Sequence, residues 1–373
     1  MDKNQKAFFE LLRAGLWENC REFQVSSLWF QDSIDWEKVY QLAEEQSVIG
    51  VVLAGIEHSY VKPPQELLLQ WIGEVQMLEQ QNLAMNKFVA QIVEKLRGED
   101  VYTLLVKGQG IAQCYEKPLW RSCGDVDFFL SEDNCEKAIS FLSPLSESVE
   151  EANHYEKHLA MTIDSWVVEL HGNLRCGLSR KIDRELDTIK KETFYEGDVR
   201  SWVDGRTHVF MLSEKNDAVY VFTHILNHFY KGGVGLRQIC DWCRLLWTYR
   251  DKIDAAFLER RLWKMGLVSE WKAFGTFAVE YLGMPSEAMP LYSASEKWTK
   301  KSDKICEFVM EVGNFGHNRD TSYYGRYPFI VRKAISLGNR CADLYRHAKI
   351  FPLDSFKFFP FMMINGFREA LRR

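Results

Sequence analysis

Two aspartates, Asp125 and Asp127, stand two residues apart in a segment with the composition of a buried strand. The segment reads GDVDFFL over residues 124–130, so that apolar residues separate and follow the two acids. Residues at positions i and i+2 of a strand project to the same face, roughly 6 to 7 Å apart. Carboxylates held side by side at the edge of an apolar core need compensation. A hard divalent cation, Mg²⁺ or Mn²⁺, supplies it, and the pattern therefore predicts a metal site that handles a phosphorylated substrate.

A third carboxylate is expected to complete this site. Glu169 stands in the alternating segment SWVVELH, residues 165–171, which we expect to form a strand antiparallel to that of the two aspartates. There it could bridge to a second metal or take a proton from the acceptor. His171 shares the face of Glu169 and is a candidate substrate contact. The structural alternative for Glu169 is an ion pair across the sheet with Lys107, Arg121 or Lys157.

Histidines gather around the same predicted sheet, at positions 154, 158 and 171. Imidazole nitrogens are zinc ligands, so His154, His158 and His171 are one possible zinc site. Single histidines on strands are more often hydrogen-bonded structural residues, and we take that as the default interpretation.

A glycine turn precedes the two aspartates. The segment LLVKGQG, residues 104–110, runs from an apolar strand into Gly108 and Gly110. Glycine lets the backbone approach a phosphate closely, and N–H groups at the start of the following helix can bind phosphate oxygens. Lys107 and Arg121 are the cations expected to neutralise such a substrate. A plain turn would also explain Gly108.

These segments together resemble the nucleotidyltransferase superfamily that shares the palm of DNA polymerase β. More closely, the chain is similar to a bacterial family of uncharacterised nucleotidyltransferases that is often associated with polysaccharide gene clusters. The resemblance covers about residues 30–250. It rests on pieces in the family's order: the strand and turn Leu105–Gly108, the box from Arg121 to Phe128, His154, Glu169–His171, and the segment from His224 and His228 to Asp241.

The resemblance implies a mechanism. Asp125, Asp127 and Glu169 would be the catalytic and metal-binding residues, and two Mg²⁺ (or Mn²⁺) ions would clamp the triphosphate of an NTP substrate. A nucleoside monophosphate would pass to an acceptor hydroxyl or phosphate, and pyrophosphate would leave. The wider superfamily usually has a serine or a second glycine where this chain has Gln109. The implied nucleotide-binding residues are Lys107, Gly108, Gln109, Arg121, His171, Arg237 and Asp241.

Two other functions fit parts of the pattern. A catalytically inactive palm would keep the fold and bind nucleotide or a regulatory partner; Gln109 favours it and the three carboxylates oppose it. A nucleotide-sugar glycosyltransferase also holds a metal with two aspartates, but it needs alternating strands and helices before them. In the C-terminal half, Arg237 and Asp241 lie one helical turn apart, either as a surface ion pair or on a helical lobe that closes over the substrate. The acceptor, the base preference and the oligomeric state cannot be read from the sequence.

Three regions are expected around this site. Residues 1–98 read as helical, with a long helix from Gln65 to Leu96 after the Pro63-Pro64 break. Residues 213–373 return to helical periodicity. Between them, residues 99–212 form a nucleotidyltransferase palm with one helix, Glu132 to Leu142, and short strands at 101–106, 125–130, 157–163, 166–171 and 207–212. We therefore expect an α+β fold, a small mixed sheet flanked by N-terminal and C-terminal helical regions.

Composition limits the possible partners and the location. The net charge of −5 argues against broad nucleic-acid binding. The chain shows no signal peptide and no run of about 18 apolar residues, so we expect a cytoplasmic protein. Nine cysteines are scattered along it, and Cys240 and Cys243 alone have CxxC spacing. Without a second pair they predict free thiols in a reducing compartment.

The C-terminal end is basic and aromatic. Residues 321–373 carry ten Lys or Arg against three Asp or Glu. By default such an amphipathic segment packs on an acidic N-terminal region of the protein; the alternatives are peripheral contact with an anionic membrane or binding of a phosphorylated acceptor. The interleaved phenylalanines are Phe351, Phe356, Phe358, Phe359, Phe361 and Phe367.

Overall fold

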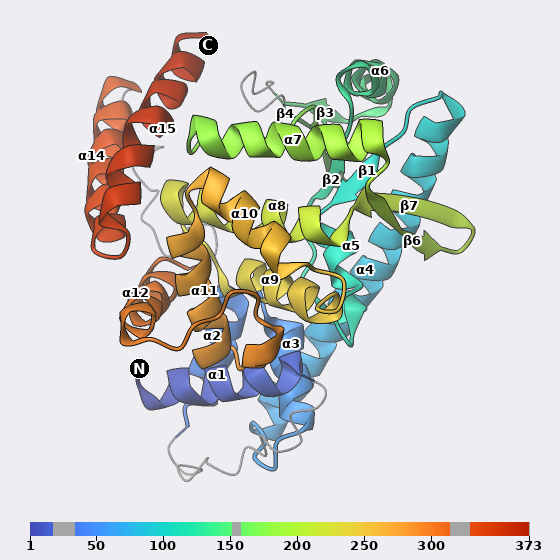
Figure 1. Ribbon diagram of the computed structural model, residues 1–373. Coiled ribbons are helices and arrows are strands. Elements are labelled where there is room, and N and C mark those ends of the chain that lie inside the picture. Colours follow the sequence, from blue (N-terminus) through green and yellow to red (C-terminus); the bar gives the residue numbers. More distant parts are fainter. Residues whose placement is uncertain (18–33, 151–157, 314–328, 373) are drawn as a thin grey trace.

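A computed structural model describes residues 1–17, 34–150, 158–313 and 329–372. Over these residues the protein is α+β, a seven-stranded mixed sheet flanked by helices (Figure 1). The expected fold class is confirmed. His154, one of the predicted family positions, lies outside the described residues.

The N-terminal region is helical, as predicted. Its helices are α1 (Lys3–Leu16), α2 (Trp36–Glu45), α3 (Ile49–Glu57) and α4 (Gln65–Gly98). Helix α4 begins directly after Pro64, which matches the predicted break. Helices α1 and α3 cross closely because a glycine on each helix faces the backbone of the other helix. A Cβ on Gly15, for example, would lie 1.9 Å from the carbonyl oxygen of Val51.

The sheet has the strand order β3-β4-β5-β2-β1-β7-β6. Its strands are β1 (Leu104–Val106), β2 (Val126–Phe129), β3 (Ser148–Val149), β4 (His158–Ile163), β5 (Trp166–His171), β6 (Val199–Asp204) and β7 (Thr207–Leu212). Strands β4 and β5 form an antiparallel hairpin. Its turn residues Asp164 and Ser165 both have positive φ, 50° and 67°, the geometry of the tight turns that suit twisted hairpins.

Strand β5 runs parallel to β2, and the expected antiparallel pairing is wrong. The reason is the connection. After β2 the chain passes through α6 (Glu132–Leu142), β3 and β4 before it returns, and β4 takes the outer position of the hairpin. An antiparallel neighbour of β2 exists, but it is β1.

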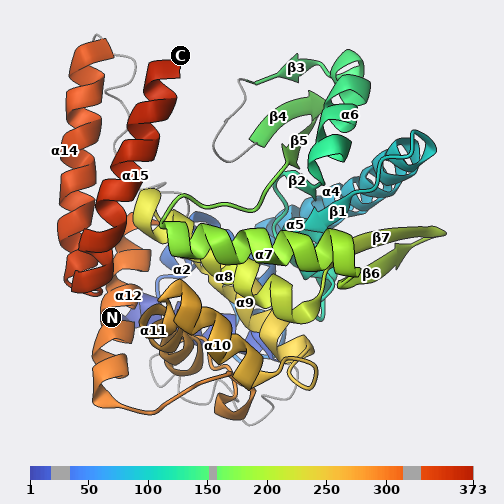
Figure 2. The ribbon, with the colours of Figure 1, turned by 45° about the horizontal axis from the view of Figure 1, so that its top comes forward.

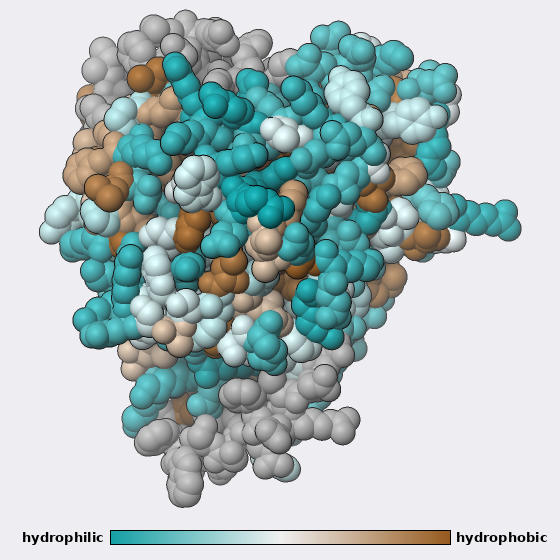
Figure 3. Space-filling model, in the orientation of Figure 1, coloured by the Kyte–Doolittle hydropathy of each residue, from teal (hydrophilic) through white to brown (hydrophobic). Residues whose placement is uncertain are grey.

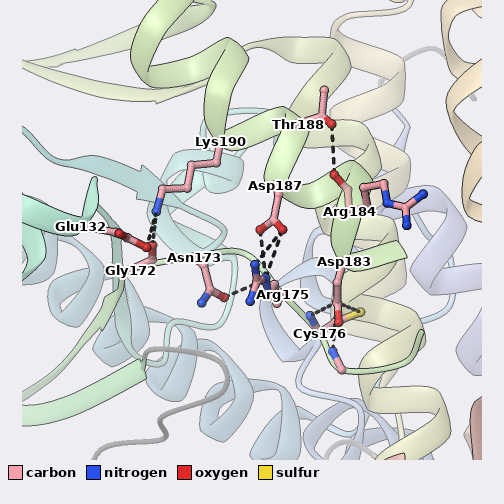
Figure 4. Close-up of polar contacts among 11 residues, drawn as sticks. Glu132, Gly172, Asn173, Arg175, Cys176, Asp183, Arg184, Asp187, Thr188 and Lys190 are labelled. Atoms are coloured by element: carbon pink, nitrogen blue, oxygen red, sulfur yellow. Dashed lines mark hydrogen bonds and ion pairs between the residues drawn. The ribbon is translucent and has the colours of Figure 1, made fainter. Parts of the chain in front are cut away.

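Helix α7 (Arg180–Glu196) and strand β6 follow β5, and neither was predicted from the sequence. Contacts with the loop after β5 anchor the first half of α7 (Figure 4). One oxygen of Asp183 accepts hydrogen bonds from the backbone N–H groups of Cys176 and Gly177. Arg175 pairs with Asp187 through two nitrogens, at 3.0 and 2.8 Å. The face of the molecule that carries α7 in Figure 1 is largely hydrophilic (Figure 3).

The C-terminal region is helical over its described residues, as predicted. Its helices are α8 (Glu214–Lys231), α9 (Leu236–Thr248), α10 (Ala255–Met265), α11 (Val268–Glu280), α12 (Glu296–Val312), α14 (Phe329–Ala348) and α15 (Pro352–Arg372). The N-terminal helices α1–α3 and the helices α8–α12 share one hydrophobic core. A second core lies between α4, α6 and the sheet.

The basic tail forms a pair of helices, α14 and α15, that lie side by side (Figures 1 and 2). Two of its phenylalanines belong to the core: Phe358 is fully buried and stacks edge-on against Tyr230, and Phe351 is buried beside Phe229. These two contacts are with helix α8 and not with the N-terminal region on which the tail was expected to pack, and Phe356 is exposed. Among the described residues, no helix is both long and apolar enough to cross a membrane.

The described cysteines are free thiols, as predicted. Cys240 and Cys243 are buried within α9, and burial raises the pKa of the Cys240 thiol well above its usual range. A thiol in that state is a poor metal ligand and a poor nucleophile.

Candidate active site

Three carboxylates meet at one side of the sheet, as the sequence predicts. Asp127 and Glu169 are register partners on β2 and β5, and Asp125 directly precedes β2. One oxygen from each of the three lies within 4.8 Å of the others. Burial and the neighbouring carboxylate of Asp127 raise the pKa of Asp125. This donor set consists of oxygens only and fits a hard divalent cation.

Lys107 extends into the same site from the end of β1. Its Nζ lies 2.7 Å from Oδ1 of Asp127, and both side chains are largely buried. Burial alone would lower the pKa of Lys107, but the charges of Asp127 and its neighbours outweigh this and raise it, so the ammonium stays charged. The backbone of Lys107 has φ 60° and ψ −147°, a strained conformation for a residue with a side chain.

Two histidines surround Glu169. Nε2 of His171 lies 2.7 Å from Oδ1 of Asp127 and 3.4 Å from Oε2 of Glu169, and Nε2 of His158 lies 3.0 Å from that same Oε2. Burial would lower the pKa of His171, but hydrogen bonds to Asp127 and Glu169 raise it. Burial would raise the pKa of Glu169, but the hydrogen bonds from the two histidines hold it well below its usual range.

Arg121 and Asp241 form a buried ion pair at the wall of the site. Two guanidinium nitrogens of Arg121 lie 3.1 and 2.7 Å from the two carboxylate oxygens of Asp241. The hydroxyl of Tyr115 donates a third hydrogen bond to Asp241, at 2.8 Å. The pair joins the loop before β2 to α9. The ion-pair partner of Asp241 is thus Arg121, 120 residues away in the sequence, and not Arg237, which lies one turn earlier on the same helix.

Arg237 is held beside this pair. Its Nη1 donates to the carbonyl oxygen of Ser122 at 3.1 Å, and a Cβ on Gly124 would lie 3.8 Å from that nitrogen. Burial and the nearby charge of Arg121 lower the pKa of Arg237. The guanidinium lines the cavity in front of Asp125.

Gln109 points away from the site. Its Nε2 donates to Oδ1 of Asn82 at 3.0 Å and to Oδ1 of Asn86 at 2.7 Å, both on α4. Asn82 in turn donates to the carbonyl oxygens of Leu119 and Arg121. The side chain of Gln109 thus links α5 (Gly108–Ala112) to α4 and to the loop that carries Arg121. It does not line the cavity, which weakens its sequence-based support for an inactive palm.

A cavity of about 210 Å³ lies between the sheet and the helices α8 and α9. The palm contributes the charged residues described above, together with Gly108. Helix α8 contributes His224 and His228, whose helical spacing makes them candidate nucleotide or acceptor contacts. Their Nε2 atoms lie 2.9 Å apart, and burial together with the charge of Lys107 lowers both pKa values, that of His228 to about 4.

A neighbouring pocket of about 130 Å³ shares Lys107 and Glu169 and extends to Asn173 and Arg175.

The model of a family described as uncharacterised nucleotidyltransferases matches residues 32–283. The chain belongs to this family. The matched range contains every residue of the site described above, from the Lys107 turn to Asp241 on α9. Searches of curated proteins and of solved structures returned no match.

Proposed function

We propose that the protein is a metal-dependent nucleotidyltransferase that moves a nucleoside monophosphate from an NTP to an acceptor hydroxyl or phosphate. Family membership supports nucleotidyl transfer. The observation that carries the finer proposal is the convergence of Asp125, Asp127 and Glu169 within 4.8 Å. Carboxylates at this spacing in a partly buried site are costly without a cation.

Different residues of the site would bind the metal and the phosphate groups. Asp125, Asp127 and Glu169 would hold Mg²⁺ or Mn²⁺, which would supply charge stabilisation to the triphosphate and to the leaving pyrophosphate. Lys107 and Arg237 line the cavity as cations and would bind phosphate oxygens. Gly108, with φ 41°, lets the backbone of the turn approach them. Arg121 and Asp241 would position the cavity wall, because each already satisfies the other.

The neighbouring pocket is the proposed place for the acceptor. It opens beside Glu169 and is lined by hydroxyl, amide and imidazole groups, among them Thr223, Asn173, Asn227 and His158. Hydroxyl, amide and imidazole groups bind a hydroxyl-bearing molecule by hydrogen bonds. Glu169 would orient the attacking hydroxyl from the boundary between the two pockets.

A catalytically inactive palm that binds nucleotide is the second candidate. One observation favours it: Lys107 and His171 both contact Oδ1 of Asp127, so two protein cations already compensate an oxygen that a metal would use. The two candidates differ in turnover but not in nucleotide binding.

Calorimetric binding of each of the four NTPs in the presence of Mg²⁺ tests the proposal. We expect one NTP to bind with micromolar affinity, equivalent to about −8 kcal/mol. The double variant Asp125→Asn/Asp127→Asn should lose this binding. The control Asp164→Asn makes the same chemical change in an exposed turn whose positive φ asparagine tolerates, and it should bind normally. Equal binding by the double variant would refute the carboxylate site.

Turnover then separates the two candidates. The NTP that binds, labelled at its α-phosphate, is incubated with fractionated small-molecule extracts, and the products are separated. Label transferred by the wild type and not by the double variant supports the transferase. Binding without transfer to any fraction supports the inactive palm.

A further inference from the structure

A second group of three possible metal ligands lies next to the carboxylates. It consists of His158 on β4 and of Glu169 and His171 on β5, and their ligand atoms all lie within 4.8 Å of one another. The hairpin produces this arrangement, because His158 and His171 are register partners and therefore share a face of the sheet. Their rings stack with centroids 4.9 Å apart.

The two histidine nitrogens converge on one oxygen. Oε2 of Glu169 lies 3.0 Å from Nε2 of His158 and 3.4 Å from Nε2 of His171. A metal with bonds of about 2.1 Å sets neighbouring ligand atoms about 3.0 Å apart in an octahedral arrangement and about 3.4 Å apart in a tetrahedral one. Charge-assisted hydrogen bonds are usually shorter, about 2.7 to 2.9 Å, as between Lys107 and Asp127 at 2.7 Å. The spacing around Glu169 fits a ligand set as well as it fits the hydrogen bonds described above.

The chemistry of this group differs from that of the three carboxylates. Mg²⁺ prefers oxygen ligands, whereas two imidazoles and one carboxylate suit Mn²⁺, Co²⁺ and Zn²⁺. Three protein ligands leave coordination positions open, as in catalytic metal sites. There is room for further ligands, because all three residues line the pocket of about 130 Å³.

We propose that His158, Glu169 and His171 form a second metal subsite that selects a transition-metal ion, and that Glu169 bridges it to the subsite of Asp125 and Asp127. Coordination by His171 would replace its hydrogen bond to Asp127. The inference rests on the proposed function only for the role of Asp125 and Asp127 as the partner subsite. Binding of the transition metal itself requires neither nucleotide nor turnover.

Cobalt binding to the chelator-treated, nucleotide-free protein tests this subsite. The visible absorption of Co²⁺ changes in position and intensity when protein ligands replace water, and Zn²⁺ calorimetry gives the affinity. We expect the wild type to bind Co²⁺ with a visible band that excess Mg²⁺ does not remove. His158→Gln should lose the band and weaken Zn²⁺ binding by at least about tenfold, since changes even to the partners of metal ligands cost that much.

Two control variants make the test specific. His208→Gln removes an exposed histidine from β7 of the same sheet and should leave Co²⁺ binding unchanged. Asp125→Asn alters only the carboxylate subsite and should keep the visible band. Circular dichroism checks that each variant is folded, and His171→Gln provides a second ligand variant should His158→Gln fail to fold.

The outcomes separate this inference from the proposed function. Co²⁺ binding that is equal in wild type and His158→Gln, or a band that Mg²⁺ removes, overturns the histidine subsite while nucleotide binding can still stand. A histidine-dependent band in a protein that binds no NTP keeps the subsite and overturns the transferase.

Discussion

Lys107 and Asp127 are joined by a buried ion pair of 2.7 Å, and Lys107 adopts a positive φ of 60° at the turn from which it makes this contact. The two residues are adjacent in the sheet, because Val106 and Asp127 are register partners on β1 and β2. Strain held at a site of this kind persists only where surrounding contacts enforce it. At Lys107 the clustered carboxylates compensate the backbone strain, because they attract the charged ammonium group of its side chain.

Replacement of this lysine should make folding depend on added metal. Lys107→Met leaves a buried carboxylate without its main cation, which costs about 3 kcal/mol of unfolding free energy. Mg²⁺ or Mn²⁺ should restore more stability to the variant than to the wild type, because the ion replaces the lost charge. Urea unfolding with chelator and with metal measures both effects. Lys38→Met, which removes an exposed pair with Asp35, should change stability by less than about 1 kcal/mol; equal losses for both variants would contradict the prediction.

The ion pair of Arg121 and Asp241 should contribute far more to the free energy of unfolding than a similar pair at the surface. Arg121→Leu strands a buried carboxylate and should cost about 3 to 5 kcal/mol. Arg175 and Asp187 have the same two-nitrogen geometry, but their side chains are 39% and 36% exposed, so Arg175→Leu should cost about 1 kcal/mol or less. Chemical unfolding of the two variants makes the comparison. Adding Asp241→Asn to Arg121→Leu should recover part of the loss, and no recovery would mean that the pair is not the cause.

Gln109 should matter for stability and not for nucleotide binding. Gln109→Ser restores the small residue that is usual in the superfamily, but it breaks the buried hydrogen bonds to Asn82 and Asn86. The loss should be about 1 to 3 kcal/mol, since two buried acceptors lose their donor. The dissociation constant for the NTP should change less than about threefold, the variation expected when a substituted residue does not contact the ligand. A tighter complex with unchanged stability would place Gln109 in the phosphate site instead.

The local features of the fold could be predicted from the sequence. Pro63 and Pro64 define the start of α4, and the alternation in residues 165–171 defines β5. Two acids at i and i+2 and a third on a neighbouring strand were enough to predict the carboxylate group. Each of these signals lies within a few residues of the feature it predicts.

The remaining features depend on contacts between distant residues. The direction of β5 depends on how many strands intervene after β2, and β3 is only two residues long. Helix α7 has a narrow apolar stripe, formed by Ile182, Leu186 and Ile189, and its polar residues Asp183 and Asp187 make contacts that no periodicity reveals. The i,i+4 rule that would pair Arg237 with Asp241 applies to an exposed helix surface, whereas α9 is mostly buried.

Glu270 should give the protein a pH-dependent stability that is unrelated to the active site. It is fully buried on α11, near Tyr230, Lys301 and Asp354, and burial together with the charge of Asp354 raises its pKa to about 8. The folded state therefore keeps a proton that the unfolded state releases near pH 4.5, the ordinary value. Between these two values the folded state binds more protons, so this group lowers stability as the pH rises, by about 1.4 kcal/mol per pH unit.

Glu270→Gln removes this proton without removing the side chain's volume. The variant should gain stability relative to the wild type progressively from pH 5 to pH 8, because only the wild type must either hold a proton or bury a charge. Urea unfolding at pH 5, 6.5 and 8 measures the difference between the two proteins, which cancels the titration of the other groups. Glu296→Gln, at a side chain that is 82% exposed, should show no such trend. A constant difference between Glu270→Gln and wild type across this range would mean that Glu270 is ionised in the folded protein, with Lys301 as its compensating charge.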